Sequence, residues 1–516
     1  MKIAGLDIGT TGCKCTVFDE NGEFLGTAYR DYPVKRAVSG HEIDVSALMD
    51  GVYAAVAEMA AQYPDIAGIG VTSFGEAFVM VDEAGKPMHP AMLLTDPRGR
   101  EECRELMDKI GADRIAEITG AHPHEMYSIS RMMWNKKNRP EIYQAAKHVL
   151  LMEDYVVYHL SGNPQIDYSL AARTMAFDIH KLDWSDEIFE AAGIDKNLMS
   201  KPVPTGTPAG TVTEEAARRT GLSRDTQIIS VSHDQVAAAI GAGAFDGSVA
   251  VEGAGTSECL TPIFDTMPDI KIMSRGHFSV VPYVIPGKYV TYAFLHVGGG
   301  LVQWCVDNLA KKEKDLAKAQ GISVNEYLEQ KYLETHGDEP SGLLVLPHFA
   351  GAATPYMDSD AKGAIVGLTM STTIEELYRG FMESIAYEMY LNKCALEGAG
   401  IGGETADGQG SDAGRSGRVI HKLHATGGCA KSKVWMQMKA DVLNVPITAL
   451  KTVNAGTVGC AMLTGIAIGV FKDLDDAAAH MIEKTVTYEP RPEMHEKYMI
   501  EFARYQRLYD AVRPLV

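Results

Sequence analysis

The feature that most constrains the fold is a hairpin rich in glycine and threonine that occurs in both halves of the chain. The first copy runs from an apolar strand through Asp7 to Gly-Thr-Thr-Gly at 9–12, and then into a strand that ends at Asp19. The second copy occupies 247–261, where an apolar strand leads to an acid, to Gly-Thr-Ser and to another strand. A repeat over this distance predicts two related domains that face each other.

Such hairpins suit the binding of phosphate. Glycine lets backbone N–H groups approach a phosphate closely, and threonine hydroxyls add donors. An ordinary edge hairpin explains the first copy alone equally well, but two copies favour a polyphosphate held between two domains. The hairpin residues that we expect at the phosphates are Gly9, Thr10, Thr11, Lys14, Gly255 and Thr256. Asp7 lies where a carboxylate could hold Mg²⁺ through water.

The length and charge of the chain limit its class and its partners. At 516 residues it is too long for one ordinary core, so two or three domains are expected. The formal net charge of −20 argues against nucleic acid and anionic membranes as partners. It does not argue against ATP, because a site can be locally positive or can use Mg²⁺ and backbone dipoles.

The cysteines and the apolar runs predict a cytoplasmic protein. The eight cysteines include no C-x-x-C pair, and they are expected to be free thiols in a reducing compartment. The chain enters a strand at once, without a signal-peptide pattern. The apolar run at 461–471 is too short to span a bilayer and predicts a buried helix.

Apolar strands alternate with amphipathic helices along the chain, which predicts an α/β fold. We place the boundary between the halves at Asp246 and Gly247, which gives domains 1–246 and 247–516. Residues 400–417 are rich in Gly, Ser, Asp and Thr and are expected to form a mobile surface insertion. The tail from Pro490 is expected to be an exposed helix.

Asp234 is the sharpest catalytic candidate. It follows the buried strand 227–232 and opens a small-residue helix, which is where sites form in open α/β sheets. The helix dipole favours an ionised carboxylate there, and an ionised carboxylate can accept the proton of an attacking hydroxyl. A plain N-cap aspartate is the alternative.

Glu76, Asp96 and Arg98 form a second polar set. Each follows an apolar strand in the same half as Asp234, and carboxylates with an arginine supply the acceptors and donors that a polyol needs. Surface turns, with Asp96-Pro97 as turn chemistry, are the alternative.

Two weaker patterns remain. Gly299 and Gly428 stand at helix starts, where a glycine lets a nucleotide lie against the backbone, although a Gly-Gly pair alone is weak support. The run His122-Pro-His124-Glu125 contains metal-ligand types, but no third ligand follows at suitable spacing, so a loop is favoured.

Together these motifs resemble one family. The order is 7–11, then Ser232-His233-Asp234-Gln235, then Gly-Thr-Ser at 255–257, and then Gly-Gly-Cys-Ala-Lys-Ser at 427–432. This order and spacing are similar to those of the FGGY carbohydrate kinases, within the actin/hexokinase/Hsp70 superfamily. The resemblance covers essentially the whole chain and ends only around the tail helix. Residues 435–441 look most like the xylulose kinases, and the first half, with 96–99 and 126–128, looks like a xylulose/fuculose-kinase-like branch.

The resemblance implies two ribonuclease-H-like (actin-like ATPase) domains, hinged over a cleft that holds ATP and a sugar. Asp234 would be the general base, Thr10, Thr11 and Thr256 would line the phosphates, and Asp7 would lie by Mg²⁺. The adenosine would be surrounded by Gly299, Gln303, Gly428 and Ser432. The sugar would contact Gly75 and Glu76, with Asp96 and Arg98 beside them.

Three departures from the family pattern stand out. Gly75-Glu76 falls where xylulose kinases carry a Met-His pair that touches the sugar, which puts xylulose itself in question. Arg131 stands where the family prefers lysine, so charge is kept while geometry differs. The 400–417 loop is longer than usual.

The resulting hypothesis is an ATP- and Mg²⁺-dependent kinase for a small sugar, with a ketopentose such as xylulose as the favoured substrate. A kinase for glycerol or another short polyol is the near alternative. A nucleotide-dependent sugar sensor, or a switch protein like actin or an Hsp70-type chaperone, is the alternative from another class. The expected partners are the sugar and ATP, and a homodimer is the oligomer left open.

Overall fold

Two six-stranded sheets form the centre of the molecule. The computed structural model describes residues 1–37, 40–398, 420–452 and 454–516, and the predicted insertion at 400–417 lies outside them. The first sheet has the order β14-β15-β6-β1-β2-β3. Its strands are β1 (Lys2–Ile8), β2 (Gly12–Asp19), β3 (Phe24–Asp31), β6 (Ile66–Ser73), β14 (Thr207–Thr211) and β15 (Gln227–His233).

The second sheet repeats the plan of the first one. It has the order β21-β17-β16-β24-β25-β26, with an antiparallel hairpin β16–β17 next to parallel strands, as β1–β2 is next to β6. Its strands are β16 (Ala250–Ala254), β17 (Glu258–Thr261), β21 (Ala293–Leu295), β24 (Leu423–Thr426), β25 (Ile447–Leu450) and β26 (Lys484–Tyr488). The predicted α/β class and the predicted pair of hairpins are confirmed.

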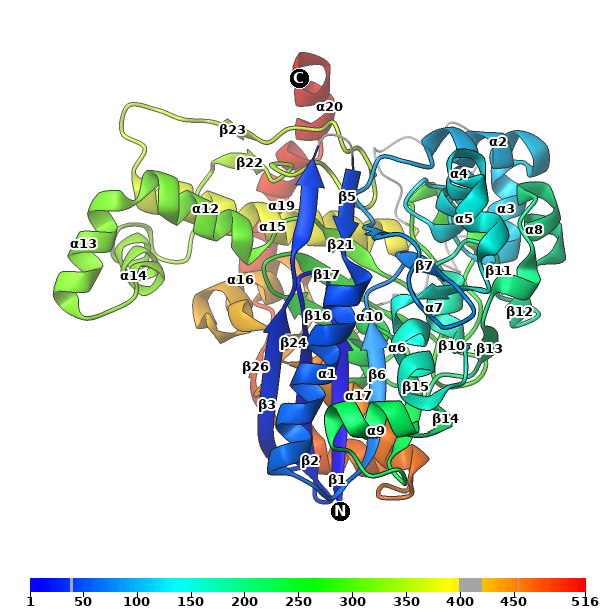
Figure 1. Cartoon of the computed structure of the whole chain (residues 1–516). Helices are drawn as coiled ribbons and strands as arrows, with labels where there is room; N and C mark the ends of the chain where they lie inside the picture. The colour runs from blue at the N-terminus through cyan, green and yellow to red at the C-terminus, as the bar shows by residue number, and fades with distance from the viewer. Residues whose placement is uncertain (38–39, 399–419, 453) are drawn as a thin grey trace.

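Helices pack on both sheets and between them (Figure 1). The first sheet is accompanied by α1 (Val45–Gln62), α6 (Met152–Ser161) and α9 (Glu214–Thr220). Asp44 caps α1 by accepting hydrogen bonds from the N–H groups of Ser46 and Ala47, which fixes where this helix begins. Its apolar face, including Leu48, Val52 and Val56, is buried on the sheet.

Two central helices, α10 (Asp234–Gly241) and α17 (Ala455–Ala467), cross in close backbone contact. A Cβ on Gly241 would lie 2.0 Å from the carbonyl oxygen of Ala455, and one on Gly459 would lie 1.9 Å from that of Ala237. The α17 helix also packs on β1, since a Cβ on Gly5 would lie 2.4 Å from the carbonyl oxygen of Thr457. A helix of the second half thus packs against the first sheet, and the division into 1–246 and 247–516 stays a prediction.

The first half also has the strand β9 (His148–Leu151) and a mainly helical region. It contains α2 (Arg100–Ile110), α3 (Ala112–Thr119), α4 (Ser128–Asn138), α5 (Pro140–Ala145), α7 (Tyr168–Ala172) and α8 (Asp186–Ala192). On the second half lie α11 (Ile270–Arg275), α12 (Gly299–Leu309), α13 (Lys311–Gln320), α14 (Val324–His336), α15 (Ile374–Leu396), α16 (Lys433–Leu443) and α18 (Leu474–Met481).

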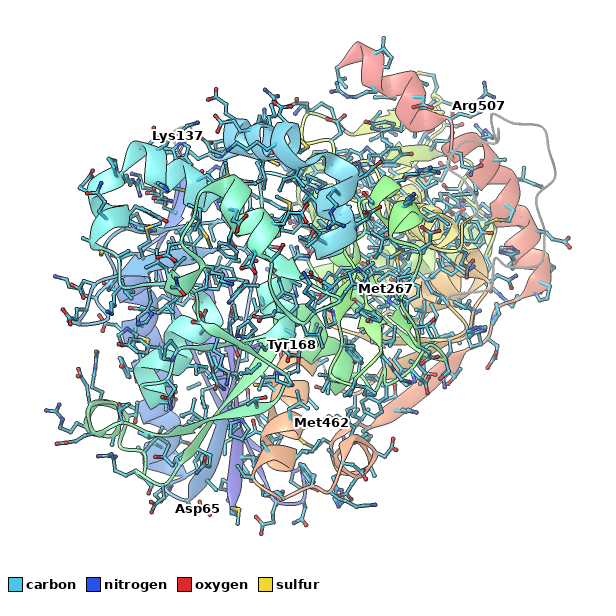
Figure 2. The ribbon with its side chains drawn as sticks, turned by 90° about the vertical axis from the view of Figure 1, so that its right-hand side faces the viewer. Asp65, Lys137, Tyr168, Met267, Met462 and Arg507 are labelled. Atoms are coloured by element: carbon cyan, nitrogen blue, oxygen red, sulfur yellow. The ribbon has the colours of Figure 1, made fainter. Side chains whose placement is uncertain are left out.

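The tail differs from its prediction. It forms α19 (Pro492–Tyr505) and α20 (Leu508–Val512), at the opposite end of the molecule from Met1 (Figures 1 and 2). One face of α19 is buried, and the Tyr498 hydroxyl there lies 2.6 Å from the buried Arg379 guanidinium. The expectation of an exposed helix was wrong, because a tyrosine and its neighbours in the tail complete the core around α15.

No helix in the described part of the chain is both long enough and apolar enough to cross a bilayer. The predicted buried helix at 461–471 corresponds to the second half of α17, where residues 458–465 are buried. All eight cysteines lie among the described residues and are free thiols, as predicted.

Candidate active site

The ends of parallel strands bring the predicted catalytic residues together. Strands β1, β6 and β15 run parallel, and their registers pair Ile8 with Ser73 and Ser73 with His233. Their carboxyl ends therefore meet at one edge of the first sheet, and Asp234 follows β15 at this edge. In the second sheet, β16 and β24 are parallel as well, so the turns that follow them also lie side by side.

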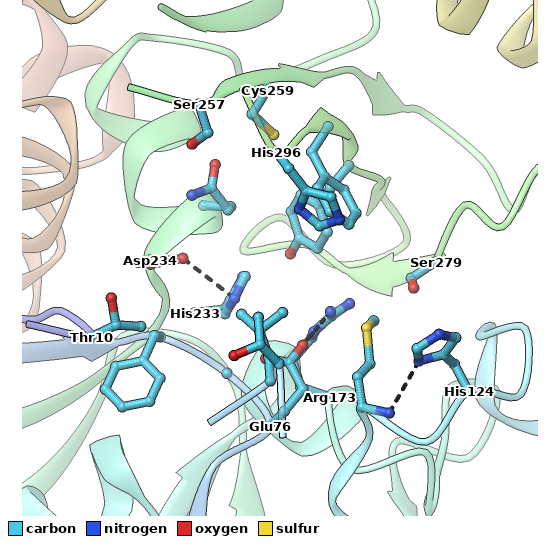
Figure 3. A pocket seen from close by; sticks show the side chains of 18 of the residues that line it. Thr10, Glu76, His124, Arg173, His233, Asp234, Ser257, Cys259, Ser279 and His296 are labelled. Atoms are coloured by element: carbon cyan, nitrogen blue, oxygen red, sulfur yellow. Dashed lines mark hydrogen bonds and ion pairs between the residues drawn. The ribbon is translucent and has the colours of Figure 1, made fainter. Parts of the chain in front are cut away.

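A cavity of about 580 Å³ lies where the two halves meet. Side chains from the first half line one part of it, among them Glu76, Arg173 and Asp234, and Thr256 and His296 of the second half line another part (Figure 3). Its volume is in the range of pockets that enclose small ligands.

Asp234 is the first residue of α10, and its side chain keeps 30% of its surface exposed. The Nε2 atom of His233 lies 3.3 Å from the Asp234 Oδ1. Burial, assisted by the nearby carboxylates of Asp7 and Glu76, raises the pKa of Asp234 to about 7. A carboxylate that titrates near neutrality can both accept and release a proton at physiological pH, as a general base must.

Asp7 lies at the end of β1, opposite Lys14 on the next strand. Burial raises the pKa of Asp7 to about 6, although Lys14 opposes the shift. The Lys14 Nζ also donates to the Asn454 Oδ1 at 3.0 Å, so the N-terminus of α17 is tied to the first hairpin.

The acids at this edge fit Mg²⁺ held partly by a nucleotide. No cluster of three or more ligand-type side chains exists among the described residues, so the protein does not offer a complete cage. Mg²⁺ is commonly held by one or two carboxylates together with substrate phosphates. Asp7, which raises the pKa of Asp234 by its charge, is a suitable carboxylate for such an ion.

A second cavity, of about 1,210 Å³, adjoins the first one, and Thr256 lines both. The structure brings together in it the residues predicted to bind the nucleotide in the second half, namely Gly255, Thr256, Gly299, Gln303, Gly428 and Ser432. A ligand that fills this cavity would therefore end at Thr256, beside the smaller cavity.

Two glycines around the larger cavity differ in how much space their surroundings leave for a side chain. The Gly299 N–H donates to the Gly255 carbonyl oxygen at 2.9 Å, and a Cβ on Gly299 would lie 2.4 Å from the Cys429 Sγ. Gly299 is therefore required by packing. A Cβ on Gly428 would meet no atom within 4 Å, so this glycine borders open space, as a ligand contact would.

The polar residues of this cavity have partners within the protein. The Gln303 Nε2 donates to the Asp307 Oδ1 at 2.9 Å. The Ser432 hydroxyl donates to the Glu329 Oε1 at 2.8 Å and accepts from the Trp435 N–H, which caps α16. Ser432 thus fixes the start of a helix at the wall of the cavity.

In the first hairpin, Thr10 lines the smaller cavity, whereas Gly9, Thr11 and Lys14 line neither of these two cavities. The Gly9 and Thr11 carbonyl oxygens both accept hydrogen bonds from Tyr32, from its hydroxyl and from its N–H respectively. Contact of Gly9, Thr11 and Lys14 with phosphates stays a prediction.

Asp96 and Arg98 lie behind the smaller cavity and do not line it. The Arg98 Nη2 lies 2.6 Å from the Asp96 Oδ2 and 2.8 Å from the Glu42 Oε1. The hydrogen bonds from Arg98 lower the pKa of Asp96 below its ordinary value. Arg131 donates to the carbonyl oxygens of Leu94 and Asp96. This network supports the Leu94 and Thr95 lining, while direct sugar contact by Asp96 and Arg98 stays a prediction.

Several lining residues were not predicted. Arg173 forms an ion pair with Glu76. Tyr292 and His296 belong to the second half of the chain. His277 has a φ of +56° and packs against His122. No motif marks Arg173, since it meets Glu76 across 97 residues of sequence. The run at 122–125 adds His122 and His124 to the cavity lining, where the His122 Nδ1 lies 2.9 Å from the Ser274 Oγ.

Comparison with known proteins identifies this arrangement. The N-terminal domain of the FGGY family of carbohydrate kinases matches residues 2–241, and the C-terminal domain of the same family matches residues 253–468. The chain belongs to the FGGY family of carbohydrate kinases. The two FGGY matches lie on the two sheets that the repeated hairpins predict, and the resemblance stated from the motifs is confirmed.

Relatives of this FGGY kinase have different substrates in their names. Xylulose kinase of Lactococcus lactis is 25% identical over 98% of this chain and 95% of its own. Gluconokinase of Bacillus subtilis is 28% identical, and so is glycerol kinase of Halorhodospira halophila, each over 96% of this chain and 93% of its own. The family activity, phosphorylation of a sugar or polyol, is therefore shared, while identity at this level does not fix the substrate.

Solved structures confirm the predicted fold of two ribonuclease-H-like, actin-like ATPase domains. Ligand-bound xylulose kinase from Lactobacillus acidophilus has a TM-score of 0.85 at 23% identity, with 99% of this chain and 98% of that chain covered. Xylulose kinase from Rhodospirillum rubrum has a TM-score of 0.86 at 23% identity, with 100% and 99% covered.

Proposed function

We propose that this FGGY kinase transfers the γ-phosphoryl group of ATP to a hydroxyl of a small ketose, with a ketopentose such as xylulose as the favoured class. The observation that carries the proposal is the adjacency of the two cavities. Thr256 lines both of them, and Asp234 lies in the smaller one. A nucleotide in the larger cavity would present its terminal phosphate toward a hydroxyl held beside Asp234.

Asp234 acts as the general base in this proposal. It accepts the proton of the substrate hydroxyl while the oxygen forms a bond to the γ-phosphorus, and the bond from that phosphorus to the bridging oxygen breaks to release ADP. His233, within 3.3 Å, orients the carboxylate. Ionised Asp234 is available because its pKa lies near neutrality.

The hairpins hold the phosphates on both sides. Threonine hydroxyls and backbone N–H groups near Thr10 and Thr256 donate to oxygens on which charge develops in the transition state. Mg²⁺, when bound, neutralises part of that charge, and Asp7 is the residue that would hold it. Closure of the two halves around the hinge would exclude water from the phosphate.

An assay of ADP release tests the proposal. The panel is D-xylulose, L-xylulose, D- and L-ribulose, L-fuculose, L-rhamnulose, gluconate, glycerol and erythritol, each with MgATP. We expect turnover on a ketose, and loss of at least about 10³-fold in kcat for Asp234→Asn, which keeps the shape but removes the base. ATP binding by the folded variant should be nearly unchanged.

Other outcomes are informative. If the folded Asp234→Asn variant loses ATP binding, Asp234 is a nucleotide contact and the proposed role is wrong. If no compound is turned over while ATP still binds, the chain is a sensor and not a kinase for this class. A cytoplasmic location and a homodimer stay predictions, which fractionation and light scattering would check.

A further inference from the structure

We infer that the smaller cavity selects an uncharged polyol or ketose over the sugar acid of the same length, and that the Glu76–Arg173 pair imposes this choice. The inference rests on the proposed kinase function and adds the charge of the substrate to it. The relatives leave the charge of the substrate undecided, since some are named for gluconate, an acid, and others for xylulose and glycerol, which are neutral.

In the Glu76–Arg173 ion pair, only one of the two carboxylate oxygens accepts hydrogen bonds from the arginine. The Arg173 Nε donates to the Glu76 Oε1 at 2.6 Å, and the Arg173 Nη2 donates to the same oxygen. Both side chains are buried, with 8% and 5% of their surfaces exposed. The Glu76 Oε2 receives no hydrogen bond from the described residues, so it remains as an acceptor for a hydroxyl.

Aromatic rings also surround the Arg173 guanidinium. Its central carbon lies 5.2 Å from the centre of the Tyr127 ring and 5.6 Å from the centre of the Tyr292 ring. Burial lowers the pKa of Arg173, but Glu76 and the two tyrosines together outweigh it and raise the pKa above its ordinary value. The charge of a guanidinium held in this way is already balanced by a carboxylate, so a sugar acid would meet an ion pair here and not an unpaired cation.

The backbone keeps Glu76 in this position. Its φ of +63° lies in the left-handed region, which is unfavourable for a non-glycine residue. A Cβ on the preceding Gly75 would lie 3.0 Å from the Arg173 Cγ and 3.2 Å from the His233 ring, so glycine is needed there to admit these side chains. The Ser128 hydroxyl donates to the Glu76 carbonyl oxygen at 2.7 Å and holds the turn.

The other lining residues add no fixed positive charge deep in the cavity. Burial lowers the pKa of every histidine there, that of His277 to about 4, so all are neutral at pH 7; they are His122, His124, His233, His277 and His296. The remaining lining cation is Arg36, which is exposed at the rim. A ligand carboxylate would therefore meet the acid Asp234 and a Glu76 whose charge Arg173 already balances, without an unpaired buried cation.

The test uses matched alditols and aldonates of four, five and six carbons as inhibitors of the wild-type kinase against its best ketose. Each pair differs only in whether one end is a hydroxymethyl group or a carboxylate. We expect each inhibiting alditol to bind at least about tenfold more tightly than its aldonate, since the aldonate carboxylate would lose its hydration beside Asp234 without an unpaired cation to balance its charge.

The Glu76→Gln variant then tests the cause. It removes the carboxylate charge and releases Arg173, so the ratio of aldonate to alditol affinity should rise at least about tenfold, while kcat/KM for the ketose falls. Arg36→Gln is the matched control, and it should leave the ratio unchanged. Circular dichroism and a thermal melt establish that each variant is folded. The affinity ratio of the wild-type kinase tests the selectivity even if a variant does not fold.

Three results would overturn the inference. In the first, an aldonate binds or is phosphorylated as well as its alditol or ketose, which leaves the kinase proposal intact. In the second, the ratio depends on Arg36 and not on Glu76, which assigns charge selection to the rim. In the third, no compound of any pair binds or is turned over, and the proposed function fails together with the inference.

Discussion

The two glycine–threonine hairpins have the same backbone arrangement, but their acidic residues lie in opposite environments. In the first hairpin, Asp7 lies at the cleft edge, faces Lys14 and contributes to the raised pKa of Asp234. In the second one, Glu252 and Glu258 have no exposed surface and share the equally buried Lys439. The first hairpin therefore keeps its acid close to Asp234, whereas the second one buries its acids in an ion cluster with a lysine.

The support of the second hairpin is electrostatic. The Lys439 Nζ donates to the Glu258 Oε1 at 2.6 Å and to the Glu252 Oε1, and the two carboxylates raise the pKa of Lys439. Burial, together with the neighbouring Glu252, raises the pKa of Glu258, and Lys439 opposes this shift. Because Lys439 is on α16 and the glutamates flank Gly255 and Thr256, the cluster joins the hairpin to the wall of the nucleotide cavity.

The largest effect is expected from breaking this support. Lys439→Met leaves a buried carboxylate without its cation and should lower the free energy of unfolding by about 3–5 kcal/mol, measured by urea unfolding. Lys431→Met, an exposed lysine at the same cavity, is the control and should change it by less than about 0.5 kcal/mol. Equal stability of the two variants would show that the cluster does not support the fold.

Asp7→Asn should have the opposite profile, with a loss of activity and no loss of stability. We expect kcat to fall about 10²–10³-fold, because a charge that acts on the phosphates and their cation is removed. The melting temperature should stay the same or rise, since burial already disfavours the ionised form of Asp7. A variant with normal kcat would remove Asp7 from the reaction.

The coupling of Asp7 to Asp234 predicts a pH dependence. Since ionised Asp234 is the proposed base and its pKa is about 7, kcat/KM should fall about tenfold per pH unit below that value. A carboxyl group whose pKa is raised by folding stabilises the folded state at low pH, and this contribution is lost as pH rises through about 7. Asp234→Asn should therefore melt higher than the wild type at pH 8, and by a smaller margin at pH 5.

Removal of single hydroxyls should have the smallest effects and compares the hairpins directly. Thr10→Val and Thr256→Val each remove one neutral donor, worth about 0.5–1.5 kcal/mol, so KM for ATP should rise about two- to tenfold. Thr256 lines both cavities and should show the larger rise. If only one of the two variants changes KM, the hairpins do not hold the phosphates jointly.

The local parts of this site were predictable from the sequence. Gly-Thr turns after apolar strands marked both hairpins, and the strand–Asp–helix pattern marked Asp234, because alternation and turn chemistry act over a few residues. The family resemblance predicted that Gly299, Gln303, Gly428 and Ser432 would share one site, and the structure brings them to one cavity.

Pairings across long stretches of sequence were not predictable. Arg173 meets Glu76 over 97 residues, and Lys439 meets Glu252 over 187 residues, and no local pattern marks either pairing. For Asp96 and Arg98, the local pattern suits a polyol site, but the structure places both residues behind the cavity, where they pair with each other. The tail helix was misjudged because its buried face depends on α15, more than 100 residues earlier.

The sequence by itself determined the family, the two repeated hairpins and the aspartate that begins α10, because these depend on residue types at short, fixed spacing. Only the tertiary structure decided which charges neutralise each other, and hence which acids are free to act at the cleft. The physical reason is that the free energy of a buried charge depends on its partners and on its distance from water, and both are set by packing between segments far apart in the chain.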